Sequence, residues 1–165
     1  MSYKNYITEV PDFPIEGVSF KDISPLLANQ KLFEECIDEM GLLVDMPDYW
    51  IGIDARGFIF ASALSMIHGG GVVMCRKKGK LPPPTASHKY KTEYSEDELE
   101  IKIGTGSVVV VDDVLATGGT LQAVNDLCQT AGYTVIDNLV LIDLLYLPTV
   151  KDFNLKVKSL IQYNE

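Results

Sequence analysis

Cysteine and histidine are scarce in this chain, which has three cysteines and two histidines among its 165 residues. Cys36, Cys75 and Cys128 lie far apart and form no Cys-x-x-Cys pair, a pattern typical of reduced thiols in a cytosol. His68 and His88 offer little from which a zinc cluster could be built. We therefore expect a cytoplasmic protein without a disulfide framework.

Long hydrophobic runs are also missing. No apolar run approaches the roughly 20 residues of a membrane-spanning helix, and the start MSYKNYITEVPDFP lacks the apolar core of a signal peptide. We expect neither membrane insertion nor export. The apolar content of 47% is ordinary for a globular protein. No repeat or linker divides the chain, so we expect a single domain over residues 1–165.

Positive charge is in short supply, because the formal net charge is −9. This balance argues against a general nucleic-acid binder, whose affinity rests on a basic surface. The 14 Lys and Arg residues are unevenly spread. Six of them fall within a short stretch: Arg76, Lys77, Lys78, Lys80, Lys89 and Lys91. Such a cluster on an acidic protein indicates either a compact anionic ligand or a solvated basic loop.

The apolar pattern predicts strands that alternate with helices. Expected strands cover residues 49–54, 72–76, 108–111 and 135–145, with a last one in the tail from residue 157. Expected helices cover residues 32–44, 57–69 and 119–131. The pattern predicts an α/β fold, a mostly parallel sheet flanked by helices. Residues 1–27 form a Pro-rich lead-in, and residues 77–101 a long excursion or lid.

Three of the expected strands end in charged residues. Asp54 and Arg56 lie at the end of the first strand, the segment 76–80 at the end of the second, and Asp112 with Asp113 at the end of the third. Ligands of parallel α/β sheets bind in the crevice beyond the carboxyl ends of the strands. We therefore expect these charged groups to converge on one site.

The segment from Ala116 to Thr120, with sequence ATGGT, opens a predicted helix. Glycines allow successive N–H groups to point into one cavity, and the helix N-terminus adds partial positive charge, so this turn suits a phosphate. It lacks the Gly-Lys-Ser/Thr of a nucleotide-hydrolysing P-loop. A capped strand-to-helix turn is the plain structural alternative. Together with the two acids before it, the turn indicates a seat for a ribose 5-phosphate.

The stretch VVVVDDVLATGGT resembles the phosphoribosyl diphosphate (PRPP) signature of the type I phosphoribosyltransferases. The segments DFPIEGVSFKDISPLL, IDARGFIF, RKKGKLPPPT and YKTEYSEDELEI are similar, in order, to segments of the adenine phosphoribosyltransferases of that family. The resemblance covers nearly the full length. It implies the type I phosphoribosyltransferase fold, with residues 1–27 as a short base-recognition hood and residues 77–101 as a flexible lid loop. It also implies purine salvage, in which adenine and PRPP become AMP and pyrophosphate.

The resemblance assigns a role to each matching position. It implies that the loop Ala116, Thr117, Gly118, Gly119 and Thr120 holds the 5-phosphate, and that Asp112 and Asp113 hold the ribose hydroxyls. It implies that Asp54, Ala55 and Arg56 form a pyrophosphate loop, often with a strained or cis peptide, and that Arg76 and Lys80 contact the leaving group. For adenine, it implies stacking on Phe20, Val114 on the other face, and the backbone of Ser19 and Lys21 at the edge. It places Glu93 and Tyr94 in the catalytic loop.

The implied cofactor is Mg²⁺, held mainly by the diphosphate and reached through water by Asp112 and Asp113. The implied assembly is a homodimer in which Arg76 serves the neighbouring site. Three positions depart from the family: Ala55 stands where Ser is common, Lys21 where Arg is frequent, and Pro83 where Gly is usual. The connection over residues 103–106 is also short. None of these departures removes a needed group if only the Lys21 backbone reads the base.

Two other functions compete with this interpretation. A PRPP-sensing regulator of DNA or RNA needs a basic surface or an added DNA-binding domain, and the charge of −9 and the short lead-in argue against both. A transferase for guanine, xanthine or orotate is the other rival. The segment around Phe20 favours adenine, through the resemblance alone.

Overall fold

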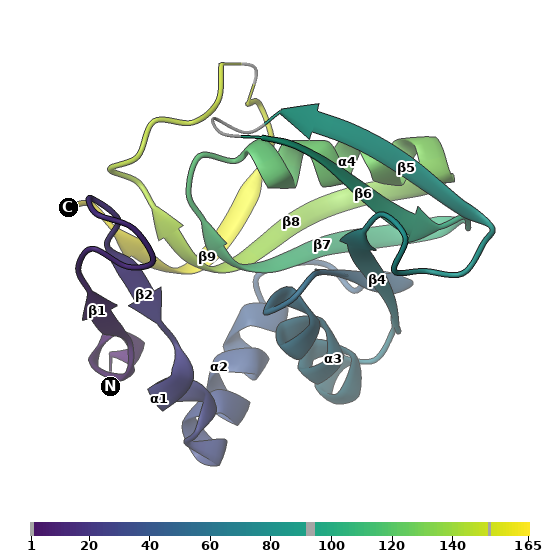
Figure 1. The fold of residues 1–165 in the computed structure, drawn as a ribbon. Coiled ribbons are helices and arrows are strands. Elements are labelled where there is room, and N and C mark those ends of the chain that lie inside the picture. The colour runs from purple at the N-terminus through teal and green to yellow at the C-terminus, as the bar shows by residue number, and fades with distance from the viewer. Residues whose placement is uncertain (1, 92–94, 152) are drawn as a thin grey trace.

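The computed structural model describes residues 2–91, 95–151 and 153–165. Its centre is a seven-stranded sheet in the order β5–β6–β4–β3–β7–β8–β9, seen edge-on in Figure 1. The strands are β3 (Tyr49–Ile53), β4 (Gly71–Lys77), β5 (Thr85–Lys91), β6 (Glu96–Lys102), β7 (Gly106–Leu115), β8 (Tyr133–Leu144) and β9 (Val157–Tyr163). Neighbours from β4 to β9 pair in parallel, and β6 pairs antiparallel with both β4 and β5. The predicted mostly parallel sheet is confirmed.

The four consecutive valines at 108–111 in β7 explain why both faces of this sheet are covered. Val109 and Val111 point into the hydrophobic core that contains α2 and α3, whereas Val108 and Val110 point into the core on the α4 side. Side chains of a strand alternate between the two faces, so an unbroken apolar run needs cover on both. The helices are α2 (Gln30–Gly41), α3 (Gly57–His68) and α4 (Gly119–Ala131).

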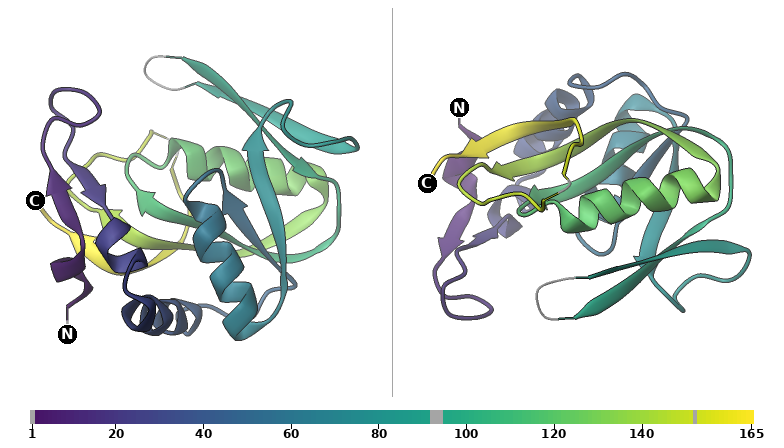
Figure 2. Two further views of the ribbon diagram at one scale, coloured as in Figure 1. Left: turned by 60° about the horizontal axis from the view of Figure 1, so that its bottom comes forward. Right: turned by 90° about the horizontal axis from the view of Figure 1, so that it is seen from above.

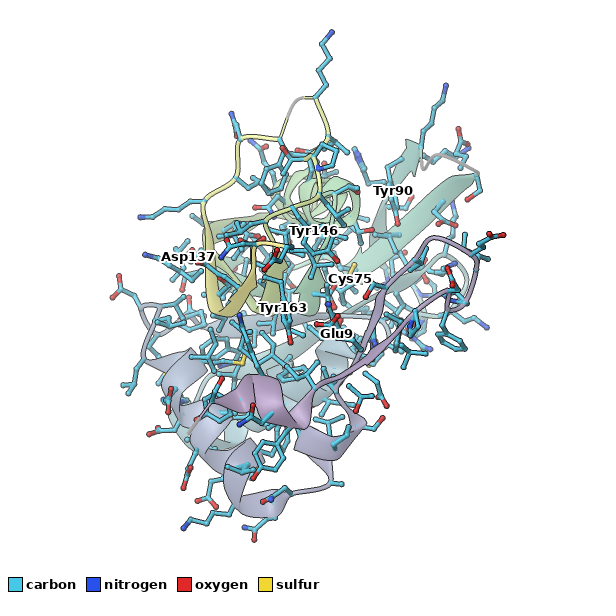
Figure 3. The ribbon with its side chains drawn as sticks, turned by 90° about the vertical axis from the view of Figure 1, so that its left-hand side faces the viewer. Glu9, Cys75, Tyr90, Asp137, Tyr146 and Tyr163 are labelled. Carbon is cyan, nitrogen blue, oxygen red and sulfur yellow. The ribbon has the colours of Figure 1, made fainter. Side chains whose placement is uncertain are left out.

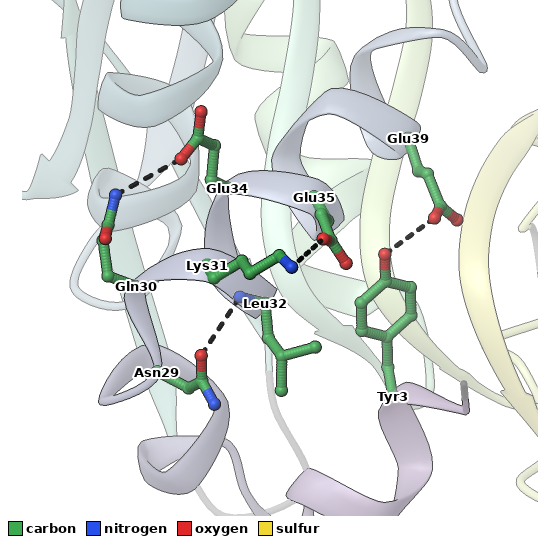
Figure 4. A network of polar contacts seen from close by, with 8 residues as sticks. All are labelled: Tyr3, Asn29, Gln30, Lys31, Leu32, Glu34, Glu35 and Glu39. Atoms are coloured by element: carbon green, nitrogen blue, oxygen red, sulfur yellow. Dashed lines mark hydrogen bonds and ion pairs between the residues drawn. The ribbon is translucent and has the colours of Figure 1, made fainter.

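Helix α2 begins at a polar cap and is joined to the start of the chain. Asn29 Oδ1 accepts a hydrogen bond from Leu32 N at 3.2 Å, which satisfies one of the free N–H groups of the first turn. Tyr3 Oη donates to Glu39 Oε1 at 2.7 Å, linking the 3₁₀ helix η1 (Tyr3–Tyr6) to α2 (Figure 4). The helix ends at Gly41, so the expected apolar residue Val44 lies beyond it.

The N-terminal lead-in is more structured than its proline content predicts. Strands β1 (Thr8–Val10) and β2 (Phe20–Asp22) form a separate two-stranded sheet, followed by the short helix α1 (Ser24–Leu27). Figure 2 shows this small sheet beside the ends of β8 and β9. We call residues 1–27 the hood, of which residue 1 lies outside the described part.

Two expectations about element length are corrected. The strand expected at residues 108–111 continues to Leu115, so Asp112 and Asp113 lie within β7 rather than beyond its end. The segment 77–101, expected as a lid with short strands, contains most of a hairpin of two seven-residue strands, β5 and β6. The last strand expected in the tail is confirmed as β9. No helix in the described ranges is long and apolar enough to span a membrane.

Candidate active site

Three hollows meet at the carboxyl ends of β3 and β7. The first surrounds the loop that opens α4, the second lies between the end of β3 and the start of α4, and the third lies under the hood. Asp112 and Thr120 line both of the first two, Val114 and Ala116 line both the first and the third, and Arg56 lines the second and the third. The hollows therefore form one continuous crevice. The predicted convergence of the strand ends at β3 and β7 is confirmed.

The first hollow is lined by every residue of the loop Ala116–Thr120. Gly118 has a positive φ of 86°, a backbone conformation that glycine adopts without a steric penalty, and it directly precedes α4. The segment after β8 supports this loop from outside, because Val150 N donates to Thr117 O at 2.8 Å and the Phe153 ring lies against Gly118. A helix N-terminus with exposed loop N–H groups is a site for an anion.

The paired acids of β7 have different partners. Asp113 Oδ2 lies 2.8 Å from Arg56 Nε, an ion-pair contact without the angle of a directed hydrogen bond. Asp112 Oδ1 accepts the Asp113 N–H at 2.9 Å. Burial, together with the neighbouring Asp113 charge, raises the pKa of Asp112 well above its ordinary value. Gly57, the first residue of α3, allows the start of this helix to lie close to the backbone of β7. A Cβ at Gly57 would lie 2.8 Å from the Val111 carbonyl oxygen.

The second hollow is lined by both acids and by the loop from Asp54 to Arg56. The Asp54–Ala55 peptide is cis, as the resemblance implies. Lys77 and Tyr90 also line this hollow, and the Tyr90 hydroxyl lies 3.3 Å from Thr120 Oγ1. The hairpin strand β5 thus contacts the phosphate loop directly.

Two expected leaving-group contacts, Arg76 and Lys80, are not among the described residues that line the three hollows. Arg76 Nε binds Asp54 Oδ2 at 3.0 Å, so its guanidinium lies at the rim of the second hollow. Lys80 lies in the turn after β4, where its backbone N–H donates to Glu100 Oε1 at 3.0 Å. Both roles stay predictions. Glu93 and Tyr94, expected in the catalytic loop, lie outside the described residues.

The third hollow has walls from three parts of the chain. The hood contributes residues 17–21, among them the predicted Ser19, Phe20 and Lys21, and β7 contributes Val114. The opposite wall consists of Leu144, Tyr146 and Leu147 from the end of β8. The Arg56 guanidinium carbon lies 4.8 Å from the centre of the Phe20 ring. Aromatic and aliphatic side chains with few polar groups suit a flat heterocycle.

Sequence reasoning missed several lining residues. Tyr90 alternates with outward-facing neighbours along β5, and this period of two was the signal that could have found it. Leu144 and Tyr146 carry no local motif. Leu144 ends β8 and Tyr146 follows it, and β8 lies beside β7, so the rule that ligands bind at strand ends was the available signal.

A divalent cation fits this site only if the phosphates of a bound substrate supply some of its ligands. No group of three or more His, Cys, Asp or Glu side chains in the described ranges is arranged to hold a metal. Mg²⁺ keeps several waters and is usually bound through one or two carboxylates and substrate phosphates. Asp112 and Asp113, beside a phosphate loop, match that donor set.

Comparison with known proteins agrees with this geometry. The phosphoribosyl transferase domain family matches residues 22–162. The adenine phosphoribosyltransferase of Bdellovibrio bacteriovorus is 47% identical over 99% of this chain and 100% of its own length. The crystal structure of adenine phosphoribosyltransferase from Thermoanaerobacter pseudethanolicus has a TM-score of 0.90 and 40% identity, covering 98% of each chain. The Giardia lamblia structure with 9-deazaadenine has a TM-score of 0.88 and 31% identity, covering 100% of this chain and 99% of that one. The chain therefore belongs to the phosphoribosyl transferase family, and within it to the adenine phosphoribosyltransferases.

Proposed function

We propose that this chain transfers the 5-phosphoribosyl group of PRPP to adenine, forming AMP and pyrophosphate in purine salvage. The observation that carries the proposal is that the three hollows adjoin one another. The apolar pocket, the hollow lined by the paired acids and the hollow of the anion loop share lining residues. A base, a ribose and a 5-phosphate are likewise joined in one molecule of AMP.

The charges of the crevice suit a substitution at C1 of the ribose. The bond from C1 to pyrophosphate breaks, the bond from C1 to adenine N9 forms, and the N9 proton is lost. Asp112 and Asp113 orient the ribose hydroxyls and place negative charge near the cation that develops on the ribose. Arg56 and Lys80 stabilise the negative charge on the leaving oxygens, together with the partner subunit's Arg76 in the dimer proposed below. We assign proton transfer at adenine to Glu93 on the basis of the sequence.

The proposed cofactor is Mg²⁺, which supplies charge neutralisation at the diphosphate when it is bound. Asp112 and Asp113 are the side chains that would hold it, through its water ligands. Their closeness to the phosphate loop supports this assignment, because both acids line a hollow with Thr120 of that loop.

Exclusion of water is the proposed role of the β5–β6 hairpin. Water attacking C1 would give ribose 5-phosphate instead of AMP, so a closed site favours transfer. The contact between Tyr90 and Thr120 supports this role, because it joins the hairpin to the phosphate loop. We propose that the segment 77–101 acts as the lid in this sense.

Adenine is the proposed base because of the hood and because of the relatives. Phe20 and Val114 line the pocket as two apolar walls, and we assign the backbone groups of Ser19 and Lys21, which also line it, to the edge of the base. The Giardia lamblia relative binds the adenine analogue 9-deazaadenine. Guanine, hypoxanthine and orotate carry different hydrogen-bonding edges, and a site built for one edge rejects another.

We further propose a homodimer formed through α3 and β4. Its support is an exposed apolar surface beside a free strand edge, since β4 pairs with β6 only through Arg76 and Lys77 among the described residues. The exposed side chains of this surface are Ile59, Met66, Ile67, Val72 and Met74. Exposed apolar patches of this kind mark interfaces. Arg76 ends the same strand, so the surface brings it towards a partner site.

The proposed location is the cytoplasm, supported by three buried cysteines that are free thiols.

The function itself is tested with purified protein, PRPP, Mg²⁺ and one free base at a time. We expect AMP to form from adenine much faster than IMP, GMP or OMP form from their bases. AMP formation no faster than that of the other three nucleotides would refute the adenine assignment.

A further inference from the structure

Lys21 is a buried charged residue that the chemistry proposed above does not use. It lies in β2, in the hood wall of the base pocket, but only 2% of its side chain is exposed. A buried ammonium group is unfavourable unless it is paired. The groups that contact its ammonium therefore indicate what this buried charge does at this position.

The partners of Lys21 are Glu9 inside the hood and Tyr163 at the end of β9. Its Nζ lies 2.9 Å from Glu9 Oε1, and Glu9 is the residue directly opposite Lys21 in the β1–β2 pair. The same Nζ lies 4.3 Å from the centre of the Tyr163 ring, at the end of β9. Figure 3 shows Glu9 and Tyr163 on the same side of the molecule as Tyr146.

Tyr163 is joined to the opposite wall of the pocket. It is paired with Leu144 across the β8–β9 ladder, and its carbonyl oxygen accepts the Leu145 N–H at 2.9 Å. Leu144, Tyr146 and Leu147 form the wall that faces the hood. Lys21 therefore pairs with Glu9 inside the hood and contacts the end of β9 through Tyr163.

We propose that Lys21 is a positioning residue that clamps the hood to the end of β9 and so sets the width of the base pocket. This proposal deepens the adenine assignment and rests on it. Within the described part of the chain, the small β1–β2 sheet is hydrogen-bonded to no strand of the main sheet. The Tyr3–Glu39 contact joins the other end of the hood to α2. The buried ammonium therefore holds the end of the hood that carries Phe20.

Lys4 provides a matched control. Its Nζ lies 4.6 Å from the centre of the same Tyr163 ring, but Lys4 is exposed and lies in η1, away from the base pocket. Cation–π contacts contribute more when the cation is desolvated. Removal of the Lys21 charge should loosen the hood, whereas removal of the Lys4 charge should leave it in place.

The test compares Lys21→Met with Lys4→Met and Lys21→Arg. We expect Lys21→Met to raise the KM for adenine at least tenfold, equivalent to about 1.4 kcal/mol, with the KM for PRPP changed less than twofold. Lys21→Arg should restore most of the loss, because a guanidinium keeps the charge and stacks on an aromatic ring. Lys4→Met should match the wild type.

Amide hydrogen exchange of the peptide 8–22 provides a readout that needs no activity. Exchange should be faster in Lys21→Met and unchanged in Lys4→Met and Lys21→Arg. If Lys21→Met does not fold, Tyr163→Leu tests the same contact and should show the same selective rise in the KM for adenine with faster hood exchange. Equal effects on both KM values, or hood exchange like that of the wild type, would overturn the clamp. Failure of the wild type to use adenine would instead refute the proposed function, whatever the exchange shows.

Discussion

At the scale of single residues, two identical and adjacent side chains differ in their surroundings. Asp113 has the Arg56 cation at 2.8 Å, whereas burial and the charge of Asp113 raise the pKa of Asp112. A ribose with two hydroxyls and a magnesium-bound diphosphate would compensate both charges when bound. In the free protein Arg56 compensates Asp113, whereas burial disfavours the charge of Asp112, so stability should depend on the protonation of Asp112.

The pH dependence of this effect has a definite sign. Asp112 has a raised pKa in the folded state, so the native protein binds more protons than the unfolded chain above the ordinary Asp pKa of about 4. Stability therefore falls as pH rises from about 4 towards the raised pKa. Asp112→Asn should melt at the wild-type temperature near pH 4 and about 2–4 °C higher at pH 8 for each kcal/mol of repulsion removed.

Asp113→Asn is the matched control for this measurement in thermal melts of the ligand-free protein. It removes the partner of Arg56, so it should lower the melting temperature at pH 8 rather than raise it. Equal shifts in the two variants would show that the acids are not distinguished by their surroundings.

The catalytic role of the pair requires both charges to be removed. Asp112→Asn with Asp113→Asn keeps the side-chain volume and hydrogen-bonding capacity but removes the charge that favours Mg²⁺ and the cationic ribose. We expect turnover to fall at least tenfold, or about 1.4 kcal/mol of transition-state stabilisation, with the fold retained by circular dichroism. Near-normal turnover of the folded variant would identify these acids as scaffolding.

At the scale of elements, motifs that are continuous in the sequence were predictable, whereas pocket walls built from separate segments of the chain were not. The bounds of α4 were predicted correctly as residues 119–131, because an apolar strand, a Gly-rich turn and an amphipathic run follow one another in the sequence. The phosphate loop was found for the same reason. The walls contributed by Leu144, Tyr146 and Tyr90 were missed, since they reach the site through strand order and register, which local patterns do not specify.

The start of α4 depends on Gly118. A Cβ at this position would lie 2.5 Å from Phe153 Cδ2, and the positive φ adds a penalty of about 1–2 kcal/mol for alanine and most other L-residues. We expect Gly118→Ala to lower the melting temperature and to raise the KM for PRPP at least tenfold, because the loop N–H groups move.

Gly79→Ala is the stability control, since Gly79 has a φ of 88° and open space around its Cα. It should show the backbone penalty alone, with a smaller fall in melting temperature than Gly118→Ala. If the two variants lose equal stability and Gly118→Ala keeps the wild-type KM, the loop tolerates a side chain and the phosphate seat is misplaced.

At the scale of the whole molecule, the proposed dimer predicts shared active sites. Two inactive variants, Arg76→Ala and Asp113→Ala, are mixed under conditions that exchange subunits. If Arg76 acts on the partner's site, each hybrid dimer has one doubly damaged site and one intact site. Random mixing makes about half of the dimers hybrid, so activity should recover to about a quarter of the wild type. No recovery, with subunit exchange confirmed by native mass spectrometry, would refute the shared site.

The central claim is that the crevice transfers a phosphoribosyl group to adenine and not to water. The most direct measurement is a product balance after incubation of the wild type with adenine, PRPP and Mg²⁺. We predict that AMP and pyrophosphate form in a ratio of one to one, with one adenine consumed for each. Release of pyrophosphate with ribose 5-phosphate and no AMP would contradict the claim, because water would then be the acceptor.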